Sequence, residues 1–215
     1  MKLKSMHTSA IAALTLCSLL SQSAASTAGA GVGNNAAQIK RGAQLSSVCS
    51  GCHGADGNTA NAELYPNLAA QNPDYIVLQL HNFKSGERPN AVMKAIATPL
   101  QESDMQALAA YFGAQKVKRQ PSADVAMEAK GRLIFSKGSA AGAPACLTCH
   151  GAQGQGQAVF PRIASQPVKY TLAQLVVYRD AAKFNNPLAS EMKAVAVKIN
   201  QDEMRAVAAY LATQP

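Results

Sequence analysis

The sequence is poor in large aromatic side chains and in charge. It has no tryptophan, and phenylalanine and tyrosine together number eleven in 215 residues. Charged residues make up 15% of the chain and hydrophobic residues 48%, which excludes the composition of a disordered protein, because there is ample apolar surface to bury. The aromatic supply is nevertheless thin for the cores of a chain of this length.

Long apolar runs are also missing, and the one short run lies near the N-terminus. Residues 10–20 are apolar, follow Lys2 and Lys4, and precede a stretch of small residues. This order is typical of an export signal, with cleavage expected near residue 25 or residue 30. A span of the bilayer needs about 20 apolar residues, so retention as an N-terminal anchor is the less favoured alternative. We predict a signal peptide over residues 1–30 and an exported mature protein.

The positive charge is spread along the chain. The formal charge is +8, and residues 1–30 contain two lysines and no acidic residue, so the mature chain carries +6. No aromatic platform accompanies the scattered lysines and arginines, and nucleic acid is therefore not expected as a partner. A basic surface of this size suits an anionic partner.

The mature sequence contains an internal repeat. The segment CSGCHG at 49–54 returns as CLTCHG at 146–151, and YPNLAAQ at 65–71 returns as FPRIASQ at 160–166. A repeat of this length predicts two similar domains, 31–120 and 121–215, joined through a polar stretch.

Helical patterns occupy both halves. A first helix is expected over 36–48, and Asn72-Pro73 is typical of the start of a second that reaches about Phe83. The last helix of the first half is expected over 103–114, and its counterpart begins at Asn200 with a capping box. Apolar residues recur on one face of these last helices: Met105, Leu108, Ala109 and Phe112, and then Met204, Val207, Ala208 and Leu211. No stretch alternates long enough for a strand, so we predict an all-α fold.

Each half carries the pattern Cys-x-x-Cys-His, which is the attachment signature of c-type haem. Two thiols three positions apart on a helical turn can reach two vinyl groups of one porphyrin, and the histidine that follows then aims a nitrogen at the iron. The residues are Cys49, Cys52 and His53, and then Cys146, Cys149 and His150. We predict two covalently attached haem c groups, which also make up for the scarcity of aromatic side chains.

Three other readings of the cysteines are weaker. A zinc site would need both halves to converge and leaves the histidines unexplained. A redox-active Cys-x-x-Cys expects a βαβ context, which is missing. A disulfide that closes a two-residue loop stabilises little.

With these motifs the chain resembles the diheme class I cytochromes c, and most closely the cytochrome c4 family, over nearly its whole mature length. The resemblance implies two tandem class I cytochrome c domains, each wrapped around one covalent haem c. It also implies a soluble periplasmic electron-transfer protein of respiration. Its partners would be a bc1-type donor and a terminal oxidase or dehydrogenase, and a peripheral association with the membrane is compatible with this role.

The sixth ligand of each iron must come from elsewhere in its domain. The candidates are Met93, Met105 and His81 in the first half, and Met192 and Met204 in the second. Met105 and Met204 lie on the apolar faces of the last helices, where methionine usually fills the core. Met93 and Met192 follow loops rich in proline and asparagine, and the family places its ligand there. We predict Met93 and Met192 as ligands opposite His53 and His150.

The resemblance assigns supporting roles to two further pairs of residues. Pro66 and Pro161 resemble the proline whose carbonyl accepts the N–H of the axial histidine, with an ordinary turn as the alternative. Gly42 and Gly131 resemble the glycines at the close crossing of the first and last helices, beside Tyr111 and Tyr210.

Two other functions remain as alternatives to a free electron carrier. One is a cytochrome subunit of a larger dehydrogenase, as in sulfide dehydrogenases. The other is a diheme enzyme, such as a peroxidase or a thiosulfate-oxidising enzyme, which needs an open or displaceable iron position. The sequence shows no acid–base cluster, because His81 is the single histidine of the mature chain outside the haem motifs. We therefore predict outer-sphere electron transfer and no enzymatic activity.

Overall fold

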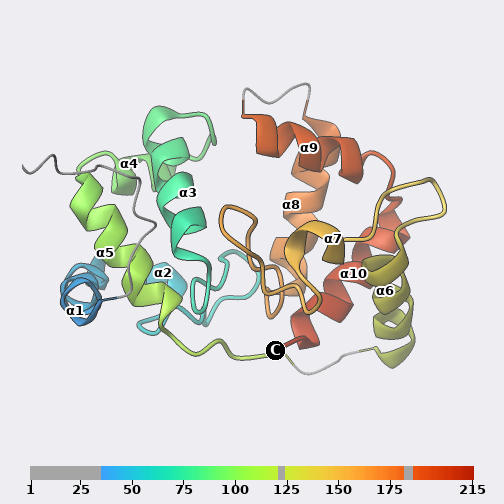
Figure 1. Ribbon diagram of the computed structural model, residues 1–215, viewed down its shortest axis with the longest axis horizontal. Helices are drawn as coiled ribbons and strands as arrows, with labels where there is room; N and C mark the ends of the chain where they lie inside the picture. The colour runs from blue at the N-terminus through green and yellow to red at the C-terminus, as the bar shows by residue number, and fades with distance from the viewer. Residues whose placement is uncertain (1–34, 121–123, 182–185) are drawn as a thin grey trace, which may run out of the picture. The chain divides into compact units, whose positions relative to one another are not determined.

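The residues described by this computed structural model, 35–120, 124–181 and 186–215, contain two consecutive sets of five helices (Figure 1). The first lobe comprises α1 (Ala36–Leu45), α2 (Ser47–His53), α3 (Pro73–Ser85), α4 (Ala91–Ala97) and α5 (Glu102–Gly113). The second lobe comprises α6 (Val125–Lys137), α7 (Leu147–His150), α8 (Val168–Asp180), α9 (Pro187–Ala196) and α10 (Gln201–Thr213). The described part of the chain has no β-strand beyond an isolated bridge, so the predicted all-α fold is confirmed.

The first and last helices of each lobe pack against each other. Figure 1 shows α1 beside α5 and α6 beside α10, and these are the most extensive helix contacts of the two lobes. Helix α3 packs on α4 and α5, while α8 packs on α9 and α10. The same five-helix arrangement therefore occurs twice, as the repeat predicts.

The predicted helix boundaries are close to the observed ones. The helix expected over 36–48 is divided at Ser46 into α1 and α2. Helix α10 begins as predicted, because the Asn200 side chain accepts from the Glu203 backbone N–H and the Glu203 carboxylate accepts from the Asn200 N–H. The apolar faces predicted for α5 and α10 are buried in full.

Two of the helices that were not predicted, α4 and α9, carry a candidate ligand. Asn90 caps α4 by accepting a hydrogen bond from the Met93 N–H at 2.9 Å. Asn186 caps α9 in the same way, and Pro187 occupies its first turn. The asparagines and the proline assigned to loops are thus helix-start signals, so Met93 and Met192 lie on short helices.

The predicted domain limits, before residue 31 and between residues 120 and 121, fall within or beside residues that the structure does not describe. The predicted signal peptide, residues 1–30, lies outside them, and so do residues 121–123 beside the expected junction. From residue 35 onward the chain belongs to one unit. Among the described residues, no helix is long and apolar enough to cross a membrane.

Candidate haem-binding sites

The first site is built on α2, where both cysteines and the histidine share one helix. His53 is 7% exposed, and its Nδ1 lies 2.9 Å from the carbonyl oxygen of Pro66. A carbonyl only accepts, so Nδ1 carries the proton and Nε2 keeps its lone pair. Burial lowers the pKa of His53, against the opposing effect of this hydrogen bond. The result is a neutral, oriented imidazole with one nitrogen available to a metal.

The second site has the same histidine geometry on α7, with Cys149 and His150 in the helix and Cys146 at its N-cap. His150 is 6% exposed, and its Nδ1 lies 2.9 Å from the carbonyl oxygen of Pro161. Burial again lowers the pKa of the imidazole, and the Pro161 hydrogen bond opposes the change. The two sites therefore hold their histidines in the same tautomer.

The first cysteine of each motif is buried, which disfavours its thiolate form. Burial raises the pKa of Cys49 to about 11 and that of Cys146 to about 11, so both are thiols at neutral pH. All four described cysteines are unpaired. No group of three or more histidine, cysteine or acidic side chains in the described part of the chain is placed to hold a metal ion.

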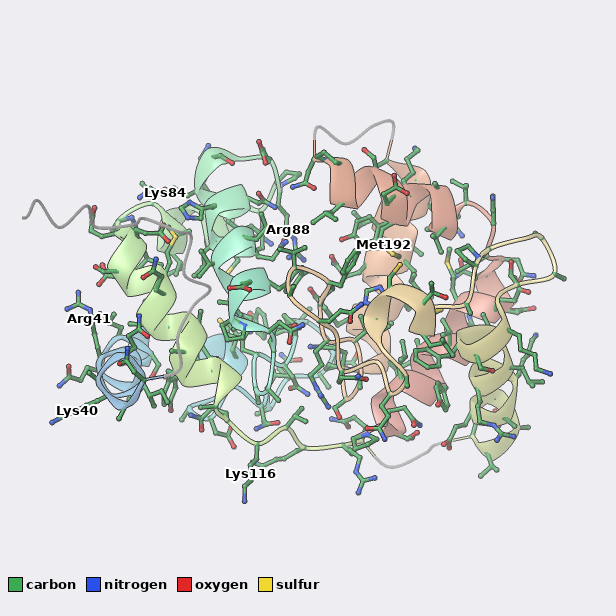
Figure 2. All side chains as sticks on the ribbon, in the orientation of Figure 1. Lys40, Arg41, Lys84, Arg88, Lys116 and Met192 are labelled. Atoms are coloured by element: carbon green, nitrogen blue, oxygen red, sulfur yellow. The ribbon has the colours of Figure 1, made fainter. Side chains whose placement is uncertain are left out.

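A mostly apolar pocket joins the haem motif of the first lobe to its candidate distal ligand. Its lining contains both cysteines, the histidine and the methionine of α4, and the complete set is Val48, Cys49, Cys52, His53, Val92, Met93 and Ile96. In the second lobe, Met192 is half-buried, and Figure 2 shows its side chain extending from α9 in the direction of α7.

The other ligand candidates are engaged elsewhere. Met105 is 1% exposed in the core of the first lobe. Met204 is fully buried beside Ala196 and Ile199 in the second lobe. His81 is exposed on α3, where its Nε2 lies 2.7 Å from a carboxylate oxygen of Glu102.

The sequence reasoning assigned no role to two arginines, one beside the second site and one between the lobes. Arg162, which follows Pro161, is 9% exposed, and its buried Nε has no hydrogen-bond partner among the described residues. Such a group fits a bound anion, and a haem carries two propionates, so the residues of the second site fit the cofactor that the motif implies. A buried arginine was not recognisable from its place in the repeat, because Asn67 occupies the equivalent position.

The second of these arginines links the lobes. The guanidinium of Arg88 donates to the hydroxyl of Tyr170 at 3.0 Å and to Oε1 of Gln174 at 2.8 Å, both on α8 (Figure 2). It also lies 4.7 Å from the ring centroid of Phe83. The two contacts with α8 depend on partners more than 80 positions away in the sequence.

Together, two helical lobes with a Cys-x-x-Cys-His helix and a carbonyl-anchored histidine in each define a diheme c-type cytochrome. The Cytochrome c family model matches residues 39–115 and 129–215. The chain is 34% identical over 184 residues to cytochrome c4 of Pseudomonas aeruginosa, which covers 84% of this chain and 90% of that protein. It is 37% identical over 172 residues to the thiosulfate dehydrogenase electron acceptor of Thiomonas intermedia, covering 78% of each.

The solved structures agree with the sequence relatives. The crystal structure of reduced recombinant cytochrome c4 from Pseudomonas stutzeri matches with a TM-score of 0.77 and 31% identity, over 82% of this chain and 98% of that chain. The chain belongs to the cytochrome c family and, within it, to the diheme electron-transfer cytochromes c4. Membership of this family implies covalently bound haem c.

Proposed function

We propose that this protein is a periplasmic electron carrier with two covalent haem c groups, one in each lobe, and no enzymatic activity of its own. Cys49 and Cys52 hold the first group and Cys146 and Cys149 the second. The observation that carries the proposal is the repeated anchoring of a buried histidine, on a cysteine-bearing helix, to a proline carbonyl at 2.9 Å.

We assign the axial ligands as His53 with Met93 and His150 with Met192. Pro66 and Pro161 hold each imidazole in the orientation that leaves Nε2 free. The pocket that contains Cys49, His53 and Met93 together supports this choice in the first lobe. When bound, haem c supplies an iron that cycles between the ferric and ferrous states. A methionine sulfur is a neutral, soft ligand that favours ferrous iron, so both sites should have raised potentials.

The domain limits follow from the same assignment. We propose a signal peptide over residues 1–30, a first domain over 31–120 and a second over 121–215. The family match begins at residue 39 in the first domain and at residue 129 in the second, which is compatible with these limits. Export places the protein in the periplasm, where haem is attached to c-type cytochromes.

The partners are proposed to be redox proteins. Electrons would arrive from a bc1-type donor or a dehydrogenase and leave to a terminal oxidase. A mature charge of +6, reduced by the haem propionates, gives modest steering toward an acidic docking surface and allows peripheral association with a membrane. Nucleic acid is not a proposed partner.

A second candidate places the chain beside a sulfur-oxidising enzyme. The likeness to the thiosulfate dehydrogenase electron acceptor of Thiomonas intermedia favours this role. In this role the chain accepts the electrons that the enzyme releases, so it remains a carrier or a cytochrome subunit.

The test is whether both irons are six-coordinate in the resting protein and react with neither hydrogen peroxide nor thiosulfate. Reduced protein is mixed with hydrogen peroxide, and oxidised protein with thiosulfate, while the haem absorbance is followed at neutral pH. We expect low-spin spectra, little turnover of either substrate, and fast, salt-dependent electron exchange with a terminal oxidase. Rapid turnover of peroxide, together with one high-spin iron in the resting protein, would show that the protein is an enzyme and not an electron carrier.

A further inference from the structure

Two glutamines at equivalent places in the repeat bind across the lobe boundary in the same way. Gln166 of the second lobe accepts from the backbone N–H of Asn67 at 3.0 Å and donates to its carbonyl oxygen at 2.8 Å. Gln71 of the first lobe accepts from the N–H of Arg162 at 2.7 Å and donates to its carbonyl oxygen at 2.9 Å. Each side-chain amide thus satisfies both backbone groups of one residue in the other lobe.

The residue that each glutamine binds directly follows the proline that anchors a histidine. The carbonyl of Pro66 and the N–H of Asn67 belong to one peptide group, which accepts from His53 at 2.9 Å and donates to Gln166 at 3.0 Å. The peptide group of Pro161 and Arg162 joins His150 to Gln71 in the same manner. A short chain of hydrogen bonds therefore runs from the histidine of each lobe to the glutamine of the other.

Burial makes these chains electrostatically effective. Gln71 is 5% exposed and Gln166 6%, and both histidines are as deeply buried. In a low-dielectric interior, hydrogen bonds in a chain polarise one another. An oxygen that accepts from the peptide N–H makes the carbonyl of the same peptide a stronger acceptor, which increases the electron density on the imidazole.

We propose that each glutamine is a positioning residue for the haem of the opposite lobe: Gln166 tunes the site of His53, and Gln71 tunes the site of His150. The proposal rests on the axial roles assigned above. A more electron-rich imidazole favours ferric iron, so each glutamine lowers the potential of the opposite site. The two lobes thus set each other's potentials.

The alternative is that the glutamines only hold the lobes together. In that case their loss would weaken the lobe boundary and change both sites alike, or neither. Gln174 provides a matched control, because it also bonds across the boundary, to Arg88 at 2.8 Å, and neither residue belongs to a peptide group that binds a histidine.

The experiment is a redox titration of the holoprotein followed by NMR, with the haem methyl signals assigned to each lobe through the single variants Met93→His and Met192→His. We expect Gln166→Leu to raise the potential of the first site and to shift the axial ring N–H signal of His53, with the second site unchanged. Gln71→Leu should do the reverse. Gln166→Glu keeps an acceptor for the Asn67 N–H, and its carboxylate is a stronger acceptor than the amide. It should therefore lower the potential of the first site and shift the His53 signal in the direction opposite to that in Gln166→Leu, whereas Gln174→Leu should shift neither site selectively.

The outcomes separate this proposal from the assignment on which it rests. Three results would overturn the effect of each glutamine on the opposite site and leave the axial ligands untouched. They are a shift in potential confined to the glutamine's own lobe, equal shifts in potential at both sites, or no shift in any of the folded variants. A high-spin iron in the unmodified protein would overturn the proposed ligands, and the tuning with them. If the leucine variants do not fold, Gln71→Glu and Gln166→Glu decide the question through the His ring N–H signals, which must shift in the opposite lobe.

Discussion

Gly42 on α1 lies directly against Ala107 on α5: a Cβ atom at position 42 would be 2.0 Å from the Ala107 carbonyl oxygen. Gly131 on α6 has the same relationship with Ala206 on α10, again at 2.0 Å. Only a residue without a side chain allows the first and last helices of each lobe to cross this closely. The crossing that the family resemblance implied for these glycines is therefore present in both lobes.

Adding a methyl group at this crossing should force the helices apart. We expect Gly42→Ala to lower the free energy of unfolding by about 1–3 kcal/mol, because the contact is with backbone that cannot move aside cheaply. Chemical denaturation monitored by circular dichroism measures the change. Ala43→Ser, at an exposed neighbouring position, should stay within about 0.5 kcal/mol of the unmodified protein. Equal stability of the two variants would mean that the crossing is loose.

The first lobe should lose stability in acid through Asp104. Its carboxylate lies 2.5 Å from the guanidinium of Arg41, which lowers the pKa of Asp104, and the Gln101 N–H adds to this effect. A lowered folded-state pKa stabilises the fold above the unfolded value, about 3.9, and this contribution disappears as the pH falls through the folded-state pKa.

The variant that tests this prediction is Asp104→Asn. Its stability deficit should be constant near neutral pH and should shrink in acid, as measured by urea unfolding between about pH 2 and pH 7. A deficit that persists unchanged at the lowest pH would assign the effect to the lost cap of α5 and not to charge.

Removing one cysteine pair should remove one haem. We expect Cys49→Ala combined with Cys52→Ala to halve the covalent haem per chain, and the equivalent change of Cys146 and Cys149 to do the same. Haem staining after denaturing electrophoresis and absorbance of the extracted protein measure the content. Haem that extracts into acidic organic solvent, or bound zinc in its place, would contradict covalent attachment.

The two methionines of the first lobe should respond differently to truncation. Met93→Ala should open the first iron alone to carbon monoxide or cyanide. Met105→Ala should leave ligation intact and cost about 2–5 kcal/mol of stability, because this side chain is fully buried in the core. Ligand-binding spectra and denaturation of both variants measure these effects, and the opposite pattern would transfer the ligand role to α5.

The local sequence determined the helices with strong start signals and apolar faces. The capping box at Asn200 and the apolar face of α5 were predictable because both depend on residues within one or two turns. The starts of α4 and α9 were missed, because asparagine and proline mark loops as well as helix caps.

The contacts between the lobes could not have been predicted in this way. Gln71 and Gln166 were recognisable as members of the repeat, but their partners lie more than 90 positions away. Nothing local distinguishes a buried glutamine that binds backbone from an exposed one. Arg88 is similar, since its partners on α8 become neighbours only when both lobes are folded.

The order of the helices also sets an order in time. The cysteines of each lobe lie near its first helix, whereas the helix that packs on that first helix, α5 or α10, is the last of its lobe to be synthesised. A chain that crosses a membrane N-terminus first therefore presents the thiols of α2 before α5 is available to pack on α1. We expect haem attachment to precede closure of each lobe.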